Sequence, residues 1–250
     1  SPLTDCFPGV AKENTLKTLV NQPPVSVGSV ALDDGSAAVF TGVRAHLDRV
    51  SIKPSQLKPG ENDGYEKIYA LKRVFHQVYD SVWLPAGSDY AYLISDLPPD
   101  MPSGFAKESQ VALEFQLRRL LGRTIEPENL WSAIGRLYES NEGRLVDYGF
   151  VNNTDAVKRH TGRRGGGDLR QDVYDKAGAA AVGDDLQLFL IAIAWSRGKE
   201  YPPKAQPELI LPGTSSDLYM PPSKLTHCIV RNCLSSKDLA FVMSRLMTHV

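Results

Sequence analysis

Residues 186–195 read LQLFLIAIAW, an apolar run in which Gln187 is the one polar side chain. A strand that is apolar at consecutive positions buries both of its faces, so this run predicts a central strand of a sheet rather than an edge strand. Residues 144–152 (RLVDYGFVN) predict a strand earlier in the chain, and residues 227–232 predict a short one after it. We therefore expect a sheet in the second half of the chain, with the basic segment 158–170 between two of its strands.

The first half of the chain also predicts strands. Residues 25–52 are rich in valine, and short period-two stretches flank the turn signal DDGS at 33–36, which predicts a β-hairpin or a small meander. Residues 89–95 predict another strand. That strand must end in the proline-rich stretch 97–102, because proline offers no amide donor to a ladder.

Four segments have the spacing of amphipathic helices, with apolar side chains at intervals of three and four. The first follows Glu66, the second ends at Gly122, and the third starts near Pro127. The last begins after Ser235, whose spacing to Asp238 resembles a capping box. Their apolar positions are Ile68, Leu71, Phe75, Val78 and Val82; Leu113, Leu117, Leu120 and Leu121; Leu130, Ile134, Leu137 and Tyr138; and Leu239, Val242, Met243 and Leu246.

The composition fits a folded protein with a substantial core, since 42% of the 250 residues are hydrophobic. Together with the expected elements this favours an α+β fold, in which about four amphipathic helices pack on a mixed, largely antiparallel sheet. We expect a single domain over residues 1–250, within which residues 20–60 can form an N-terminal β subdomain.

Charge and cysteine content exclude several classes of protein. The 28 Lys and Arg residues against 29 Asp and Glu give a formal net charge of −1, so any nucleic-acid contact must come from a local patch. Three cysteines, Cys6, Cys228 and Cys233, are too few for a disulfide-built secreted scaffold, and no run approaches the roughly 20 apolar residues of a membrane helix. We therefore expect an intracellular, cytoplasmic protein without membrane contact. The chain begins at Ser1 without methionine, which favours trimming or excision from a longer protein.

The segment KRHTGRRGGGDLR at residues 158–170 carries the strongest functional signal. It places five Lys and Arg side chains against one carboxylate and among four glycines. Arginine binds phosphate oxygens in bidentate fashion, and glycine lets backbone amides approach a ligand closely. Tyr148 and Tyr174, with His160, can stack on the bases of a single strand. The predicted phosphate-binding residues are Lys158, Arg159, His160, Arg163, Arg164 and Arg170.

Other interpretations of this segment remain open. Nearby aspartates can pair with most of its arginines and leave only an internal ion-pair network or a mobile loop, or the segment can be a surface for a protein partner. Alternatively, Asp147 with Asp168 or Asp172 can hold a metal ion for phosphodiester cleavage, which predicts a nuclease-like enzyme. The aspartates in question are Asp147, Asp155, Asp168, Asp172 and Asp175.

A further alternative is a structural subunit or protein-interaction scaffold without chemistry, which binds other proteins or forms a homo-oligomer. Trp83, Trp131 and Tyr219 would supply aromatic contacts in such an interface. The proline-rich stretches 96–102 and 201–222 would wrap a neighbouring subunit, although they fit long surface loops equally well.

Common catalytic signatures are absent, since the chain has no P-loop, no dinucleotide fingerprint, no H-E-x-x-H and no G-x-S-x-G. His227, Cys228 and Cys233 are donor types that suit zinc, but free cysteines beside a strand are more typical of a core. His76 lies four residues before Asp80, which on a helix is the spacing of a surface pair. The sequence thus predicts binding of nucleic acid, DNA or RNA, or of another polyanion. The expected protein is a non-catalytic component of a larger assembly, with no cofactor and no resident metal.

Overall fold

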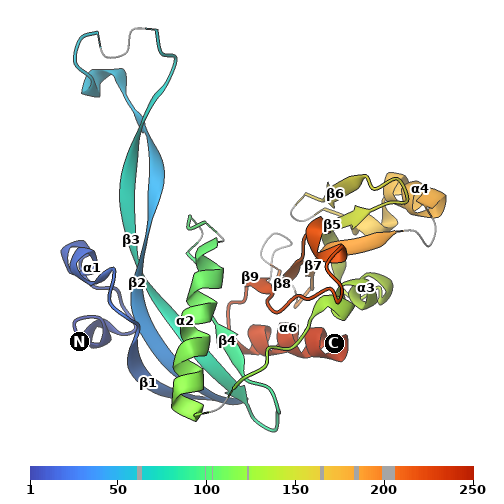
Figure 1. The fold of residues 1–250 in the computed structure, drawn as a ribbon, viewed down its shortest axis with the longest axis horizontal. Helices are drawn as coiled ribbons and strands as arrows, with labels where there is room; N and C mark the ends of the chain where they lie inside the picture. Colours follow the sequence, from blue (N-terminus) through green and yellow to red (C-terminus); the bar gives the residue numbers. More distant parts are fainter. Residues whose placement is uncertain are drawn as a thin grey trace. The chain divides into compact units, whose positions relative to one another are not determined.

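The computed structural model describes residues 1–60, 64–98, 100–102, 104–122, 124–163, 166–182, 186–198 and 206–250. The chain divides into two compact units, Ser1–Ile125 and Glu126–Val250. The described residues of the first unit form a four-stranded antiparallel sheet, and those of the second form a five-stranded one (Figure 1). The α+β class expected from the sequence is therefore confirmed, with two sheets in place of one. The single domain expected over 1–250 stays a prediction.

The first unit is built on a long β-hairpin. Its strands β2 (Gly35–Ile52) and β3 (Ile68–Pro85) pair along their whole length. The flanking strands β1 (Val25–Leu32) and β4 (Tyr92–Ile94) complete the order β1-β2-β3-β4. At the turn between β1 and β2, Gly35 has a φ of +151°, and a Cβ there would lie 2.2 Å from the Leu84 carbonyl oxygen, so the turn requires glycine. The hairpin predicted over residues 25–52 is confirmed, and the strand predicted at 89–95 is confirmed in its central part.

The helix predicted to follow Glu66 is wrong, because this segment forms β3. Its apolar positions divide between the two faces of the strand, and apolar side chains on both faces imitate helical intervals of three and four. Valine and aromatic residues between positions 74 and 83 favour an extended backbone. The alternation along β3 places Ile68, Val78 and Val82 on one face and Leu71 and Phe75 on the other.

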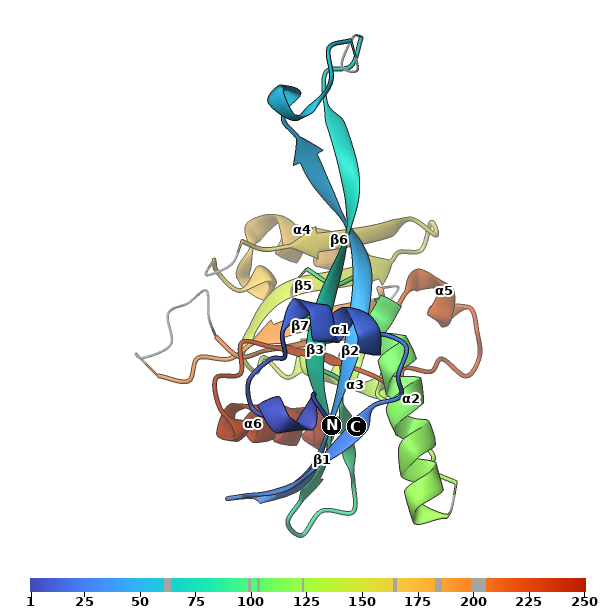
Figure 2. The same cartoon turned by 90° about the vertical axis from the view of Figure 1, so that its left-hand side faces the viewer.

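Both faces of β2 and β3 are covered at the end of the hairpin that lies next to β1 and β4. A short η1 (Thr4–Cys6) and α1 (Glu13–Leu19) belong to the cover of one face, and α2 (Gly104–Leu121) covers the other. Figures 1 and 2 show α1 and α2 on opposite sides of the hairpin. The two small cores are Leu3, Ala11, Leu16 and Val43 with Phe75 packed against them, and Phe40, Val82, Leu113 and Leu117.

Beyond this cover the hairpin continues as a two-stranded arm, formed by the described residues 47–60 and 64–73. Figure 1 shows the arm extending past α1 and α2, with η2 (Pro54–Gln56) close to its tip. Large apolar side chains are exposed on it, among them Leu47 at 55%, Tyr69 at 46% and Leu71 at 67%. A two-stranded hairpin is only marginally stable in water, and exposed apolar patches mark contact surfaces. The arm therefore presents exposed apolar side chains on a two-stranded ribbon.

The second unit is built on a sheet of order β6-β5-β7-β8-β9. The apolar run at residues 186–195 forms the central strand β7, as predicted, and its residues 189–194 are buried. The connection predicted over 201–222 also contains a strand and a short helix, β8 and α5 (Ser215–Leu218). The strands are β5 (Arg144–Val151), β6 (Val157–Thr161), β7 (Gln187–Ala194), β8 (Glu208–Pro212) and β9 (Ile229–Arg231).

The helices of the second unit bury the apolar faces that the sequence predicted. In α3 (Trp131–Glu139), Ala133, Ile134 and Leu137 are fully buried, and the helix packs against β7. At the start of α6 (Ser236–Thr248), Ser235 Oγ accepts a hydrogen bond from the Asp238 amide at 3.3 Å, which confirms the predicted cap. The basic segment leads through η3 (Leu169–Gln171) into α4 (Val173–Val182).

Candidate functional site

The basic segment begins on β6, which is an edge strand paired only with β5 in its sheet. His160 stands opposite Tyr148, so these side chains share one face of the pair, whereas Arg159 and Thr161 lie on the other face with Asp147. After β6, the Gly166 amide donates to the Arg163 carbonyl at 2.8 Å. Arg164, one of the predicted phosphate ligands, lies outside the described residues.

Arg159 is paired with a carboxylate of its own sheet. Its Nε donates to Asp147 Oδ1 at 3.0 Å and its Nη2 to Asp147 Oδ2 at 2.5 Å, a bidentate ion pair. Hydrogen bonding to the carboxylate raises the pKa of Arg159. The arginine side chain nevertheless stays 57% exposed, while that of Asp147 is 12% exposed. Arg159 can therefore still meet a ligand, but part of its charge is already neutralised.

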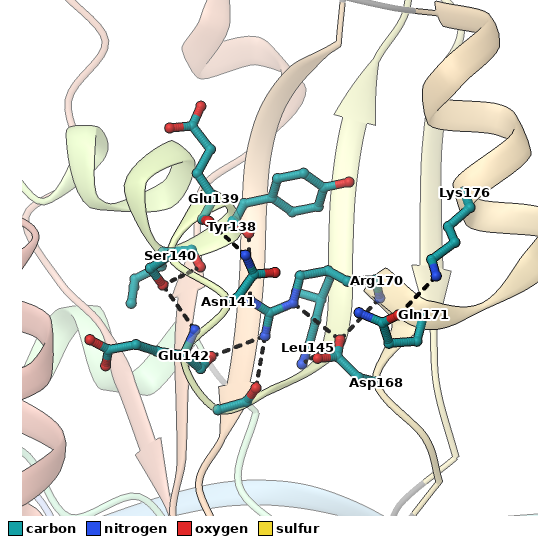
Figure 3. A network of polar contacts seen from close by, with 12 residues as sticks. Tyr138, Glu139, Ser140, Asn141, Glu142, Leu145, Asp168, Arg170, Gln171 and Lys176 are labelled. Atoms are coloured by element: carbon teal, nitrogen blue, oxygen red, sulfur yellow. Dashed lines mark hydrogen bonds and ion pairs between the residues drawn. The ribbon is translucent and has the colours of Figure 1, made fainter.

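Arg170 is folded into the protein, with a side chain that is only 6% exposed. Figure 3 shows its guanidinium among backbone carbonyls and the Asp168 carboxylate. It donates to the carbonyl oxygens of Glu142 at 3.0 Å and Gly143 at 2.8 Å, and its Nε lies 3.1 Å from Asp168 Oδ1. Asp168 in turn accepts from the Leu145 amide at 3.2 Å. Arg170 thus links the start of β5 to η3. These internal contacts account for the position of its side chain without a bound phosphate.

His160 also has its partners within the second unit. Its Nδ1 contacts Asp175 Oδ1 and lies 3.2 Å from the hydroxyl of Tyr148. The rings of Tyr148, Phe150 and Tyr174 surround the imidazole, with centroids 5.3 to 5.8 Å away. Burial and the nearby Asp175 carboxylate raise the pKa of Tyr148. His160 and Tyr148 are therefore parts of a packed aromatic cluster rather than an open stacking platform.

Two of the predicted cations are exposed and uncommitted in the part of the chain that the structure describes. Lys158 on β6 and Arg163 after it form no ion pair with a described carboxylate. Internal pairing thus describes some residues of the basic segment, and availability for a phosphate ligand describes others. Arg159, His160 and Arg170 have internal partners, whereas Lys158 and Arg163 face solvent.

The carboxylates proposed for a nuclease-like site have separate structural roles. Asp147 holds Arg159 and accepts a hydrogen bond from Thr161 Oγ1 at 3.1 Å, and Asp168 holds Arg170. Asp172 caps α4, accepting from the Tyr174 amide at 2.9 Å. Among the described residues, none of these carboxylates belongs to a group of three or more potential metal ligands. The described geometry therefore offers no support for that alternative.

The other candidate sites are similarly resolved by the structure. Burial raises the pKa of the Cys228 thiol to about 12 and that of Cys233 to about 11. Among the described residues, His227, Cys228 and Cys233 do not form a group of three potential metal ligands. The expected contact of His76 with Asp80 is replaced by other partners. Asp80 binds Arg44 at 2.5 Å, and His76 Nε2 lies 3.6 Å from Asp100 Oδ2.

The arm is a cationic surface that could not be predicted from the sequence, because the apolar spacing of its second strand, β3, is typical of a helix. Along residues 47–73 there are six Lys and Arg residues against four Asp and Glu, a net charge of +2 in a chain of net −1. On one face, Leu47 stands opposite Arg73 and Arg49 opposite Leu71. Among the described residues, five cations of the arm form no ion pair: Arg49, Lys53, Lys67, Lys72 and Arg73.

No family model matches this chain, and no curated protein or solved structure matches it either. Within the described residues, no helix has the length and apolar character that crossing a membrane requires. What the protein does has to follow from its own side chains.

Proposed function

We propose that this protein binds nucleic acid as a non-catalytic component of a larger assembly, and that the arm is the main contact. The observation that carries the proposal is an exposed two-stranded ribbon with five cations that form no ion pair with described carboxylates. A two-stranded β-ribbon has a width that enters the major groove of a duplex. Lysine and arginine along it neutralise phosphates and release counterions, which is the main source of affinity for nucleic acid.

One face of the arm supports this assignment further. It combines Arg49 and Arg73 with Tyr69, and the Arg49 guanidinium lies 5.2 Å from the centre of the Tyr69 ring. Guanidinium and phenol groups both stack on bases, while the guanidinium also binds phosphate. At the tip, a pocket is lined by Lys53, Tyr65, Glu66 and Lys67 among other residues. Charge and aromatic surface thus alternate along the arm, a combination that suits a nucleic-acid strand.

The basic segment supplies a second, smaller contact in this proposal. Lys158 and Arg163 are exposed, and Arg159 keeps more than half of its side chain in solvent. Arg164 belongs to the same predicted set. His160 and Arg170, which have internal partners, act by holding the segment in shape. A contact with so few uncommitted cations is expected to add to binding by the arm without replacing it.

The proposal is tested by titrating labelled double-stranded DNA, single-stranded DNA and RNA with the protein at about 50 mM and about 200 mM salt. The double variant Arg49→Ala with Arg73→Ala should weaken binding and reduce the slope of log K against log salt by about 2 on a duplex. The matched control is Lys12→Ala with Arg119→Ala, which removes two exposed cations outside the arm and should leave the slope unchanged. Equal binding by the two double variants, or no binding to any of the three nucleic acids at low salt, would overturn the proposal.

A second candidate function is a scaffold contact to another protein through the same arm, and the exposed Leu47 and Leu71 favour it. Sedimentation of the protein without nucleic acid separates the two. A stable oligomer that dissociates in the Leu71→Ser variant, together with absent nucleic-acid binding, would assign the arm to protein association.

A further inference from the structure

His46, His76 and Asp100 converge at the root of the arm, where the cover by α1 and α2 ends. One ligand atom of each residue lies within 4.8 Å of the ligand atoms of the other two. His46 belongs to β2 and His76 to β3. The register places Arg44 opposite His76 and Val74 opposite His46, so the two histidines are diagonal neighbours on one face of the ribbon. Asp100 comes from the segment between β4 and α2.

The two imidazoles lie face to face with ring centroids 5.3 Å apart and planes inclined by 10°. His46 is 6% exposed, and both of its ring nitrogens are buried without a hydrogen-bond partner. Nε2 of His76 is also buried without one, although Asp100 Oδ2 lies 3.6 Å away. Buried polar atoms in folded proteins almost always have a partner, and each exception requires an explanation. One nitrogen of each histidine faces the cluster with the Asp100 carboxylate, and neither ring nitrogen of His46 nor Nε2 of His76 has a hydrogen-bond partner, which indicates that a ligand fits between them.

We propose that His46, His76 and Asp100 bind a divalent transition-metal ion of the zinc type. Two imidazoles and one carboxylate are donors that such ions prefer. His76 Nε2 and Asp100 Oδ2 lie 3.6 Å apart, which is close to the separation of two donor atoms that each lie about 2.0 to 2.2 Å from one tetrahedral ion. The paired strands β2 and β3 hold both histidines. Three protein ligands leave a coordination position for water.

A network of polar contacts next to the cluster connects the segment that carries Asp100 to β2 and β3. Arg44, the cross-strand neighbour of His76, is neutralised by Asp80 at 2.5 Å. Asp80 Oδ1 also accepts from the Asp96 amide at 3.0 Å, and Arg44 donates to the Asp96 carbonyl. This network ties the segment that carries Asp100 to β2 and β3. A metal ion bound by His46, His76 and Asp100 would add a second link between this segment and the two strands. Metal binding would therefore make the base of the arm more rigid.

The test uses the full chain, stripped of metal with a chelator and then titrated calorimetrically with Zn²⁺ and spectroscopically with Co²⁺. The expected result is one equivalent of Zn²⁺, bound at least 100-fold more weakly by the His76→Ala variant and by Asp100→Asn. Cobalt should give visible absorption bands of nitrogen and oxygen ligation without thiolate charge transfer. The matched control is Cys228→Ser with Cys233→Ser, which should bind Zn²⁺ like the unmodified protein.

The Asp100 side chain is exposed, so Asp100→Asn is expected to leave the protein folded. This variant therefore still tests the site if His76→Ala unfolds. Loss of the one-equivalent site in Asp100→Asn, with a folded far-UV spectrum, supports the site. Failure of the unmodified protein to bind Zn²⁺ below about 100 μM, or unchanged binding in Asp100→Asn and His76→Ala, would overturn it. The site is independent of nucleic-acid binding, because these measurements contain no nucleic acid.

Discussion

Replacing Arg170 with alanine should destabilise the second unit without directly removing a ligand contact. The guanidinium is almost wholly buried and holds Asp168 together with the carbonyl oxygens of Glu142 and Gly143. A hydrogen bond to a charged group contributes about 1.5–3 kcal/mol, and breaking a buried ion pair costs about 3–5 kcal/mol. Because Asp168 is 23% exposed and recovers some hydration, we expect a loss of about 3 kcal/mol in the free energy of unfolding.

The assay is urea unfolding followed by tryptophan fluorescence in a Trp83→Phe background. This background leaves Trp131 and Trp195 as reporters, and both belong to the second unit. The matched control is Arg163→Ala, which removes an exposed arginine from the same segment and should change the free energy of unfolding by less than about 0.5 kcal/mol. If Arg170→Ala were as stable as the control but bound nucleic acid much more weakly, the structural role assigned to Arg170 would be refuted.

Three further predictions concern single positions. Gly35→Ala should destabilise the first unit by more than about 2 kcal/mol in urea unfolding, since the added Cβ would lie 2.2 Å from the Leu84 carbonyl oxygen; Gly178→Ala, which meets nothing within 4 Å, is the control. Ser235→Ala should cost about 1 kcal/mol in the same measurement by removing the cap of α6, whereas Ser235→Asp should restore most of it. The Cys228 thiol, with a pKa of about 12, should resist iodoacetamide at pH 8 in the native protein and react on unfolding, as followed by mass spectrometry; rapid native alkylation would contradict the raised pKa.

The parts of the fold that the sequence predicted are those in which one local signal decides the structure. The run at 186–195 has no polar face and becomes the central β7. Ser235 and Asp238 give the start of α6, because a cap depends only on residues three positions apart. In β3 the local signal was ambiguous, since tertiary cover on both faces adds apolar residues that imitate a helical period.

For the candidate sites too, local sequence does not determine which side chains are exposed or which ones meet in space. Arg163 and Arg170 are indistinguishable by type and lie in one segment, yet one is exposed and the other is buried among carbonyls. His46 and His76 are distant in sequence and meet only through the register of β2 with β3. Once β3 had been taken for a helix, neither the arm nor the histidine pair could be predicted. Strand pairing, which depends on residues far apart in the chain, supplied the missing information.

Amide hydrogen exchange with and without a short duplex at low salt measures whether the arm contacts nucleic acid. We expect protection on binding over residues 47–53 and 67–73, with weaker protection over 157–163. The Arg49→Ala with Arg73→Ala variant should lose the protection of the arm. Binding that leaves the amides of the arm as exchangeable as in the free protein would contradict the account.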